Sequence, residues 1–173
     1  MTGRHRDFFP ISLGVYALVA LFGVLNNEAI ATVSPMHFVV YHPRYFPFEN
    51  AHLQALGFAL IVTGAPGLAW GILLYWAGHY GPGPIVGVRA TLLGAAVVVI
   101  LTVSLAWLVG WRETASGIPP YPIFFFPSED PKLYLSQTVQ LTNFIAGFIG
   151  ASAWLIGIAA WRQHRTKTAA QKT

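Results

Sequence analysis

Residues 85–111 read IVGVRATLLGAAVVVILTVSLAWLVGW and carry one charged side chain, that of Arg89. A helix rises about 1.5 Å per residue, so roughly 20 apolar residues cross a bilayer core of about 30 Å. The run is continuously apolar rather than alternating, which favours a helix over a strand of a membrane barrel. Three further stretches share this character, at about 11–31, 52–76 and 135–161. The sequence therefore predicts an all-α membrane protein, a four-transmembrane-helix bundle forming one integral membrane domain over residues 1–173.

The composition supports this class. Of the 173 residues, 55% are hydrophobic and 9% are charged, against roughly 25% charged residues in soluble domains. The chain has no cysteine, which excludes disulfides and thiolate metal sites. Its basic residues crowd a C-terminal tail, 162–173, rather than a folded patch. Membrane lipids are therefore the expected partners, nucleic acid is not, and another membrane subunit or a second copy of the chain is the alternative.

The distribution of lysine and arginine predicts the orientation. Most of them lie in the N-terminal segment, the second loop and the tail, whereas Arg44, Arg112 and Lys132 lie on the other side. Cytoplasmic loops carry an excess of Lys and Arg. We therefore expect both termini to be cytoplasmic in a bacterial inner membrane.

A secretory signal is the alternative interpretation of residues 1–31. The segment has a basic start, an apolar core and Ala29-Ile30-Ala31 as a small-x-small cleavage site. Polar residues crowd this site, and cleavage would remove the first span, so the transmembrane interpretation is preferred.

An internal repeat organises the chain. The sequence FPFENAHL at 46–53 returns as FPSEDPKL at 126–133, which predicts two parallel-repeat helical hairpins, about 1–80 and 81–173. Asn50 and Asp130 occupy helix N-cap positions. Glu49 and Glu129 are not explained by capping, and we expect these repeat-motif carboxylates to lie together under long outer loops rich in aromatic residues and proline.

A polar cluster forms the candidate ligand-binding site. Polar groups within a span are costly against lipid and should face the bundle interior or a wet cavity. Glu28 near the end of the first span is the best single candidate, with His52 as its partner. The other members lie along one side of the fourth span: Gln137, Gln140 and Asn143.

Histidines offer a second, weaker hypothesis. His37, His42 and His52 are the residue types that bind zinc, copper or iron, but their spacing matches no tight ligand pattern. No nucleophile motif, phosphate-binding loop or zinc helix is present, so no catalytic residue and no cofactor are predicted.

Three functions are compatible with these features. The preferred one is a small non-enzymatic membrane protein that binds a lipid-like ligand or a membrane partner through its outer aromatic loops and the polar cluster. An ion, proton or small-solute transport unit that uses Glu28 is the first alternative. A membrane-interface enzyme with an outer-face His/Glu site is the second.

Overall fold

The computed structural model describes residues 5–126 and 128–171, and within them the chain is helical with no strand. The helices are η1 (His5–Asp7), α1 (Phe8–Val33), α2 (Met36–Val39), α3 (Ala51–Phe58), the π-helical η2 (Ala59–Thr63), α4 (Gly64–His79), α5 (Val88–Ser116), η3 (Ile123–Phe125) and α6 (Pro131–Ala170). Four stretches are long and apolar enough to cross a membrane: Phe8–Val33, Ala51–His79, Val88–Ser116 and Pro131–Ala170. The predicted class of all-α protein with four candidate spans is confirmed.

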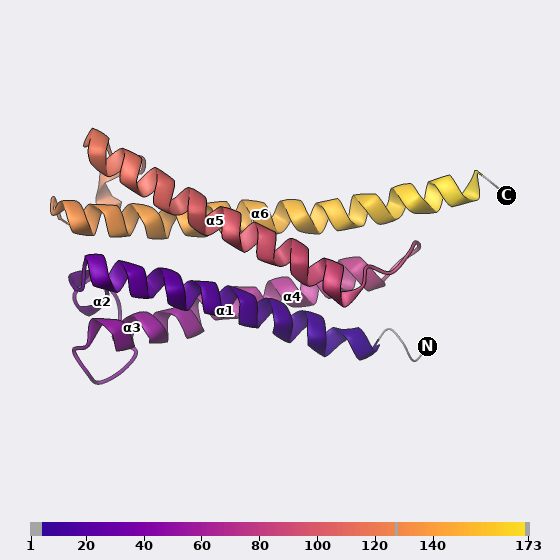
Figure 1. Ribbon diagram of the computed structural model, residues 1–173, viewed down its shortest axis with the longest axis horizontal. Coiled ribbons are helices and arrows are strands. Elements are labelled where there is room, and N and C mark those ends of the chain that lie inside the picture. Colours follow the sequence, from indigo (N-terminus) through magenta and orange to yellow (C-terminus); the bar gives the residue numbers. More distant parts are fainter. Residues whose placement is uncertain (1–4, 127, 172–173) are drawn as a thin grey trace.

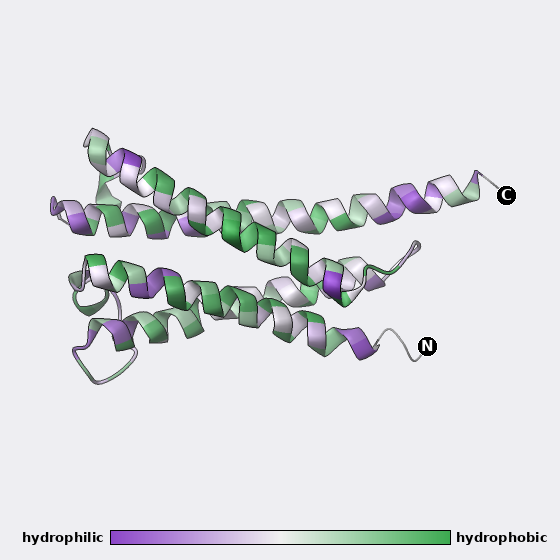
Figure 2. Cartoon of the chain, in the orientation of Figure 1, coloured by the Kyte–Doolittle hydropathy of each residue, from purple (hydrophilic) through white to green (hydrophobic). Residues whose placement is uncertain are grey.

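The four long helical stretches run along one another as an elongated bundle (Figure 1). Helix α1 lies beside α3 and α4, and α5 crosses α6. The loops before α3 and before α6 lie at one end of the bundle, which we call the loop end, and both chain termini lie at the other, the tail end. Hydrophobic residues dominate the middle of the bundle and hydrophilic residues gather toward its ends (Figure 2). The repeat relation between the two hairpins stays a prediction.

The two predicted N-caps begin the helices as expected. The Asn50 side chain accepts a hydrogen bond from the backbone N–H of Leu53 at 3.1 Å, and Asp130 accepts one from Lys132 at 2.9 Å. Each cap satisfies an amide of the first turn that has no partner within the helix. Pro131 follows its cap directly, at a position where the missing proline N–H costs nothing.

The second span is interrupted just before Pro66. Helix α3 ends at Phe58, the π-helical segment η2 covers Ala59–Thr63, and α4 resumes at Gly64. Pro66 lies in the first turn of α4 and cannot donate a backbone hydrogen bond to the preceding turn. A π-helical turn beside a proline is one way in which a long helix absorbs this loss.

Small residues let the helices approach closely. A Cβ atom at Gly71 would lie 2.8 Å from the backbone oxygen of Ser12, so α1 and α4 touch through their backbones there. On the other helix pair, a Cβ at Gly94 would lie 2.1 Å from the ring of Trp154. Close backbone packing is a principal source of helix association where lipid is as apolar as the side chains.

Polar contacts close the tail end. His79 is fully buried, its Nδ1–H donates to the carbonyl of Tyr75, and its Nε2 lies 3.1 Å from a carboxylate oxygen of Asp7. Arg162 is only 3% exposed. The sequence assigns this arginine to a free basic tail, but α6 continues to Ala170 and places Arg162 beneath the link between α4 and α5. A guanidinium so deep is retained because the turns of that link aim carbonyl oxygens at it.

Candidate functional site

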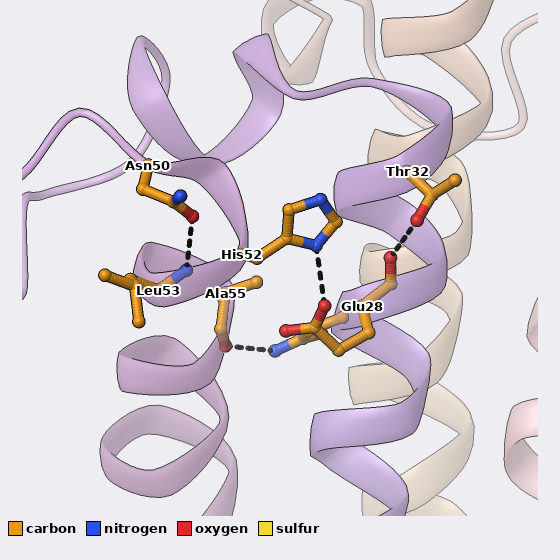
Figure 3. Close-up of polar contacts among 7 residues, drawn as sticks. Glu28, Thr32, Asn50, His52, Leu53 and Ala55 are labelled. Atoms are coloured by element: carbon orange, nitrogen blue, oxygen red, sulfur yellow. Dashed lines mark hydrogen bonds and ion pairs between the residues drawn. The ribbon is translucent and has the colours of Figure 1, made fainter.

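Glu28 and His52 form a hydrogen-bonded pair at the loop end (Figure 3). His52 Nδ1 lies 2.6 Å from Glu28 Oε2, and the two side chains are 54% and 39% exposed. Helix α1 supplies the carboxylate and the first turn of α3 supplies the imidazole. The pair is therefore a partly solvated contact between the two helices, and an exposed pair of this kind contributes little stability.

Gln54 holds the loop that precedes α3. Its side chain is 1% exposed, and its Oε1 accepts hydrogen bonds from the backbone amides of Tyr45 and Phe46 at 2.6 and 3.2 Å. Its Nε2 donates to the carbonyls of Phe46 and Phe48 at 2.8 and 2.6 Å. One glutamine thus uses both ends of its amide to fix the loop backbone.

A second pair of histidines meets Gln140 inside the loop end. His37 from α2 is fully buried, and its Nε2–H donates to Gln140 Oε1 on α6. His42 Nε2 lies 3.1 Å from His37 Nε2. The rings of Phe38 and Phe58 pack against His42 with centroids 5.6 and 4.7 Å away. We call His37, His42 and Gln140 the histidine cluster.

Burial keeps both histidines of the cluster neutral. Desolvation is the main cause that lowers the pKa of His37 from 6.5 to about 4. The hydrogen bond to Gln140 raises this pKa, and the neighbouring His42 lowers it further. Desolvation also lowers the pKa of His42, and the bond to Gln140 again opposes it. Near neutral pH each ring therefore keeps an unprotonated nitrogen.

The remaining predicted site residues are dispersed. Glu49 is exposed and pairs with Arg44 at 2.8 Å, and Glu129 is exposed two residues before the start of α6. Gln137 and Asn143 are half-buried on α6. His52 pairs with Glu28 and does not join His37 and His42, so the three predicted metal-binding histidines are divided between two places. In the described residues, no three His, Asp or Glu side chains gather as a metal site.

A buried amide network was missed by sequence reasoning. Asn26 and Asn27 are 4% and 3% exposed in α1. Asn26 accepts a hydrogen bond from Trp107 Nε1 at 3.0 Å, and Asn27 donates to the carbonyl of Ala55 at 3.4 Å. The sequence signal for this network was two adjacent amide side chains within an apolar span. Such groups must find hydrogen-bond partners inside the bundle.

A cavity of about 460 Å³ lies between the spans. Side chains from all four candidate spans line it, and most are apolar. Its polar members are Thr63, Thr102, Asn143 and Ser152. Of the predicted polar cluster, Asn143 alone contributes to this wall.

Comparison with known proteins found no match. No protein-family model matches the chain, and no curated protein and no solved structure matches it. The class that the fold and the cavity define is a helical bundle with four candidate membrane spans.

Proposed function

We propose that the chain is a non-enzymatic integral membrane protein that binds a lipid-like ligand in the cavity between its spans. The observation that carries this proposal is the cavity of about 460 Å³. Its volume falls within the range of about 300–1,000 Å³ that is typical of small-molecule pockets. Apolar walls with a few placed polar groups are also typical of such pockets. The proposal moves the ligand from the outer loops, where the sequence places it, to the bundle interior.

The position of the cavity favours a ligand that comes from the bilayer. Its wall residues belong to the candidate spans, and the outer faces of those spans expose large apolar side chains, such as Leu101 at 63% and Leu108 at 68%. A molecule that reaches the cavity must first partition into hydrocarbon. The hydroxyls of Thr63 and Thr102 and the amide of Asn143 give it partners for one carbonyl or hydroxyl group.

The interrupted second span helps to form this space. Val62 and Thr63 of η2, together with Pro66 and Gly67 of α4, line the cavity. On the opposite side, Gly147 of α6 presents no side chain, and a Cβ there would have only one neighbour within 4 Å, Thr102 Cγ2 at 3.6 Å. A helix that widens on one wall and a glycine on the other leave room for a ligand.

Filling the cavity tests the proposal. Gly147→Leu places a side chain into the cavity without a clash at its Cβ. Gly157→Leu on the same helix is the matched control, because nothing lies within 4 Å of a Cβ there and the residue does not line the cavity. We expect the parent protein and Gly157→Leu to retain lipid through purification, measured by native mass spectrometry and solvent extraction, and Gly147→Leu to lose it.

A second readout uses a fluorescent polyene fatty acid added to lipid-stripped protein. Saturable binding that weakens in Gly147→Leu but not in Gly157→Leu would support the cavity as the site. If the three proteins retain and bind equal amounts, or none binds, the proposal is wrong.

The proposed location is a bacterial inner membrane with both termini in the cytoplasm. Supporting it, η1, the start of α5 and the end of α6 lie at the tail end, and these segments carry Arg6, Arg89, Arg165 and Lys167. Cytoplasmic segments are enriched in such residues. Because the chain has no cysteine, single substitutions report position cleanly. A membrane-impermeant maleimide added to whole cells should label Glu129→Cys but not Gln163→Cys, and the reverse pattern would invert the assignment.

The two alternative functions remain predictions centred on Glu28. Proton or ion flux in liposomes that disappears in Glu28→Gln would support the transport unit. Turnover of a membrane-interface substrate that requires Glu28 and His52 would support the enzyme.

A further inference from the structure

The histidine cluster brings three metal-binding atoms to one point. His37 Nε2 and His42 Nε2 lie 3.1 Å apart, and Gln140 Oε1 contacts His37 Nε2. The atoms come from the short helix α2, the loop after it and the first quarter of α6. His37 and His42 are five residues apart in the sequence, whereas Gln140 lies 103 positions from His37, so the fold brings the third atom to the pair.

The separation of the two nitrogens is suitable for two ligands of one metal ion. Two nitrogens about 2.0–2.1 Å from a tetrahedral Zn²⁺ lie roughly 3.3–3.4 Å apart. At a right angle, as in tetragonal Cu²⁺, the same bond lengths separate them by roughly 2.9 Å. The observed 3.1 Å lies between these values. A linear arrangement needs roughly 4 Å at such bond lengths, so the geometry favours a bent pair of ligands on a divalent ion.

We propose that His37 and His42, with Gln140 Oε1 as a third ligand, form a binding site for a divalent transition-metal ion, Zn²⁺ or Cu²⁺. Imidazole nitrogen suits both ions. Gln140 Oε1 lies closer to His37 Nε2 than two ligands of one ion can, so its amide must move back when an ion binds. With two imidazoles and one amide oxygen, water completes the coordination, and the site is open rather than closed. This site is distinct from the proposed lipid cavity, which neither histidine lines.

The surroundings hold the imidazole rings in place. The ring of Phe38 lies edge-on to His37 at 4.8 Å and stacks on His42 with an interplanar angle of 29°. Phe58 contacts the His42 ring at 4.7 Å. Aromatic walls of this kind limit rotation of the ligands, so little ordering is required when an ion binds.

The tautomer of His37 decides whether its Nε2 can bind an ion. A metal ion needs the lone pair of a neutral imidazole nitrogen. His37 Nδ1 is buried and has no hydrogen-bond partner among the described residues. In the metal-free protein the hydrogen bond to Gln140 places the ring proton on Nε2. Metal binding therefore requires the other tautomer, in which Nε2 has lost its proton and Nδ1 has gained one. Because Nδ1–H then lacks an acceptor, we expect moderate rather than very tight affinity.

An ion can reach the cluster from the loop end. His42 is half-buried and belongs to the loop before α3, whereas His37 and Gln140 are buried beneath it. His42 is therefore the ligand whose substitution disturbs the interior least. His42→Phe keeps a planar ring between Phe38 and Phe58 while it removes both nitrogens.

The test titrates chelator-treated full-length protein with Zn²⁺ and, separately, with Cu²⁺ against a chromogenic indicator. We expect one equivalent to bind, and the affinity of His42→Phe to fall by more than the roughly tenfold that loss of an outer-shell partner already costs. His52→Phe and His164→Phe are the matched controls, because these histidines lie outside the cluster. Circular dichroism and size-exclusion profiles that match the parent protein verify that each variant is folded.

Cu²⁺ spectroscopy gives an independent readout. Paramagnetic resonance of the Cu²⁺ form should show nitrogen couplings from two imidazoles in the parent protein and in His52→Phe. Gln140→Leu should retain both nitrogens but weaken binding. If neither ion binds, if His42→Phe binds as well as the parent protein, or if the couplings depend on His5 of the N-terminal segment instead, the proposal is overturned.

Discussion

Replacement of Arg162 by methionine should destabilise the fold from its tail end. The side chain is 3% exposed and lies under the link between α4 and α5. Its guanidinium donates to five carbonyl oxygens, those of Ala77, Tyr80, Gly81, Gly83 and Pro84. Three of these bonds are short, at 2.9, 2.6 and 2.5 Å, and two are long, at 3.3 and 3.4 Å.

The magnitude follows from those contacts. A hydrogen bond to a charged group contributes about 1.5–3 kcal/mol net, so the three short bonds set an upper bound of roughly 5–9 kcal/mol. Desolvation of the guanidinium costs several kcal/mol and methionine avoids that cost. Residues 80–84 are also exposed, so water can reach their carbonyls once the arginine is gone. We therefore expect Arg162→Met to lower the free energy of unfolding by about 2–4 kcal/mol.

The assay is reversible unfolding in mixed micelles, titrated with a denaturing detergent and followed by circular dichroism. Arg165→Met is the matched control, because Arg165 is exposed on the same helix and contacts only the ring face of Trp161 among the described residues, at 5.8 Å. Arg162→Lys should recover part of the loss, since an ammonium has three donors instead of five. If Arg162→Met and Arg165→Met unfold at the same denaturant concentration, the reasoning is refuted.

Two further predictions concern the loop end. Gln54→Ala should lower the free energy of unfolding by about 2 kcal/mol, because four hydrogen bonds of roughly 0.5–1.5 kcal/mol each are lost while the loop backbone can rehydrate. Hydrogen exchange at the Tyr45 amide should become faster in Gln54→Ala. The control variant Gln137→Ala should leave this exchange rate unchanged. The metal-free protein should lose stability as the pH falls from 6.5 toward 4. In this range His37 binds a proton in the unfolded chain but not in the folded protein, where burial lowers its pKa to about 4. The contribution is complete above pH 6.5 and amounts to at most roughly 3 kcal/mol. Unfolding titrations across this range should show a flatter pH dependence in His37→Asn than in the parent protein and in His52→Asn, and equal slopes would contradict the assignment.

The spans and caps were predictable because their signals are local. The apolar run of 85–111 specifies a helix through its own composition, and the observed α5 covers Val88–Ser116. Asn50 and Asp130 cap helices that begin one residue later, so the pattern and the hydrogen bond lie within a single turn. The π-helical segment before Pro66 also follows from a local rule, the missing proline donor.

The histidine cluster and the role of Arg162 were not predictable in the same way. His37 meets Gln140 across 103 positions of sequence, and Arg162 reaches carbonyls about 80 positions away, as with Gly81 at a separation of 81. Such contacts depend on the register between helices, which is set by close packing at positions such as Gly71 and Gly94. The sequence shows that a polar residue lies within an apolar segment, but it does not show which residue is its hydrogen-bond partner.

The distribution of polar contacts indicates where the helices can separate to admit a ligand. The tail end is closed by the contacts of Arg162 and His79, and the loop end by those of Gln54 and His37. Between these ends the spans meet mainly through apolar packing around the cavity, and hydrocarbon outside gives that packing little hydrophobic advantage. Movement of the interrupted second span about its π-helical segment therefore breaks few hydrogen bonds between helices, whereas movement at either end breaks several. A ligand that enters from the bilayer should consequently separate the spans at mid-depth while both ends stay closed.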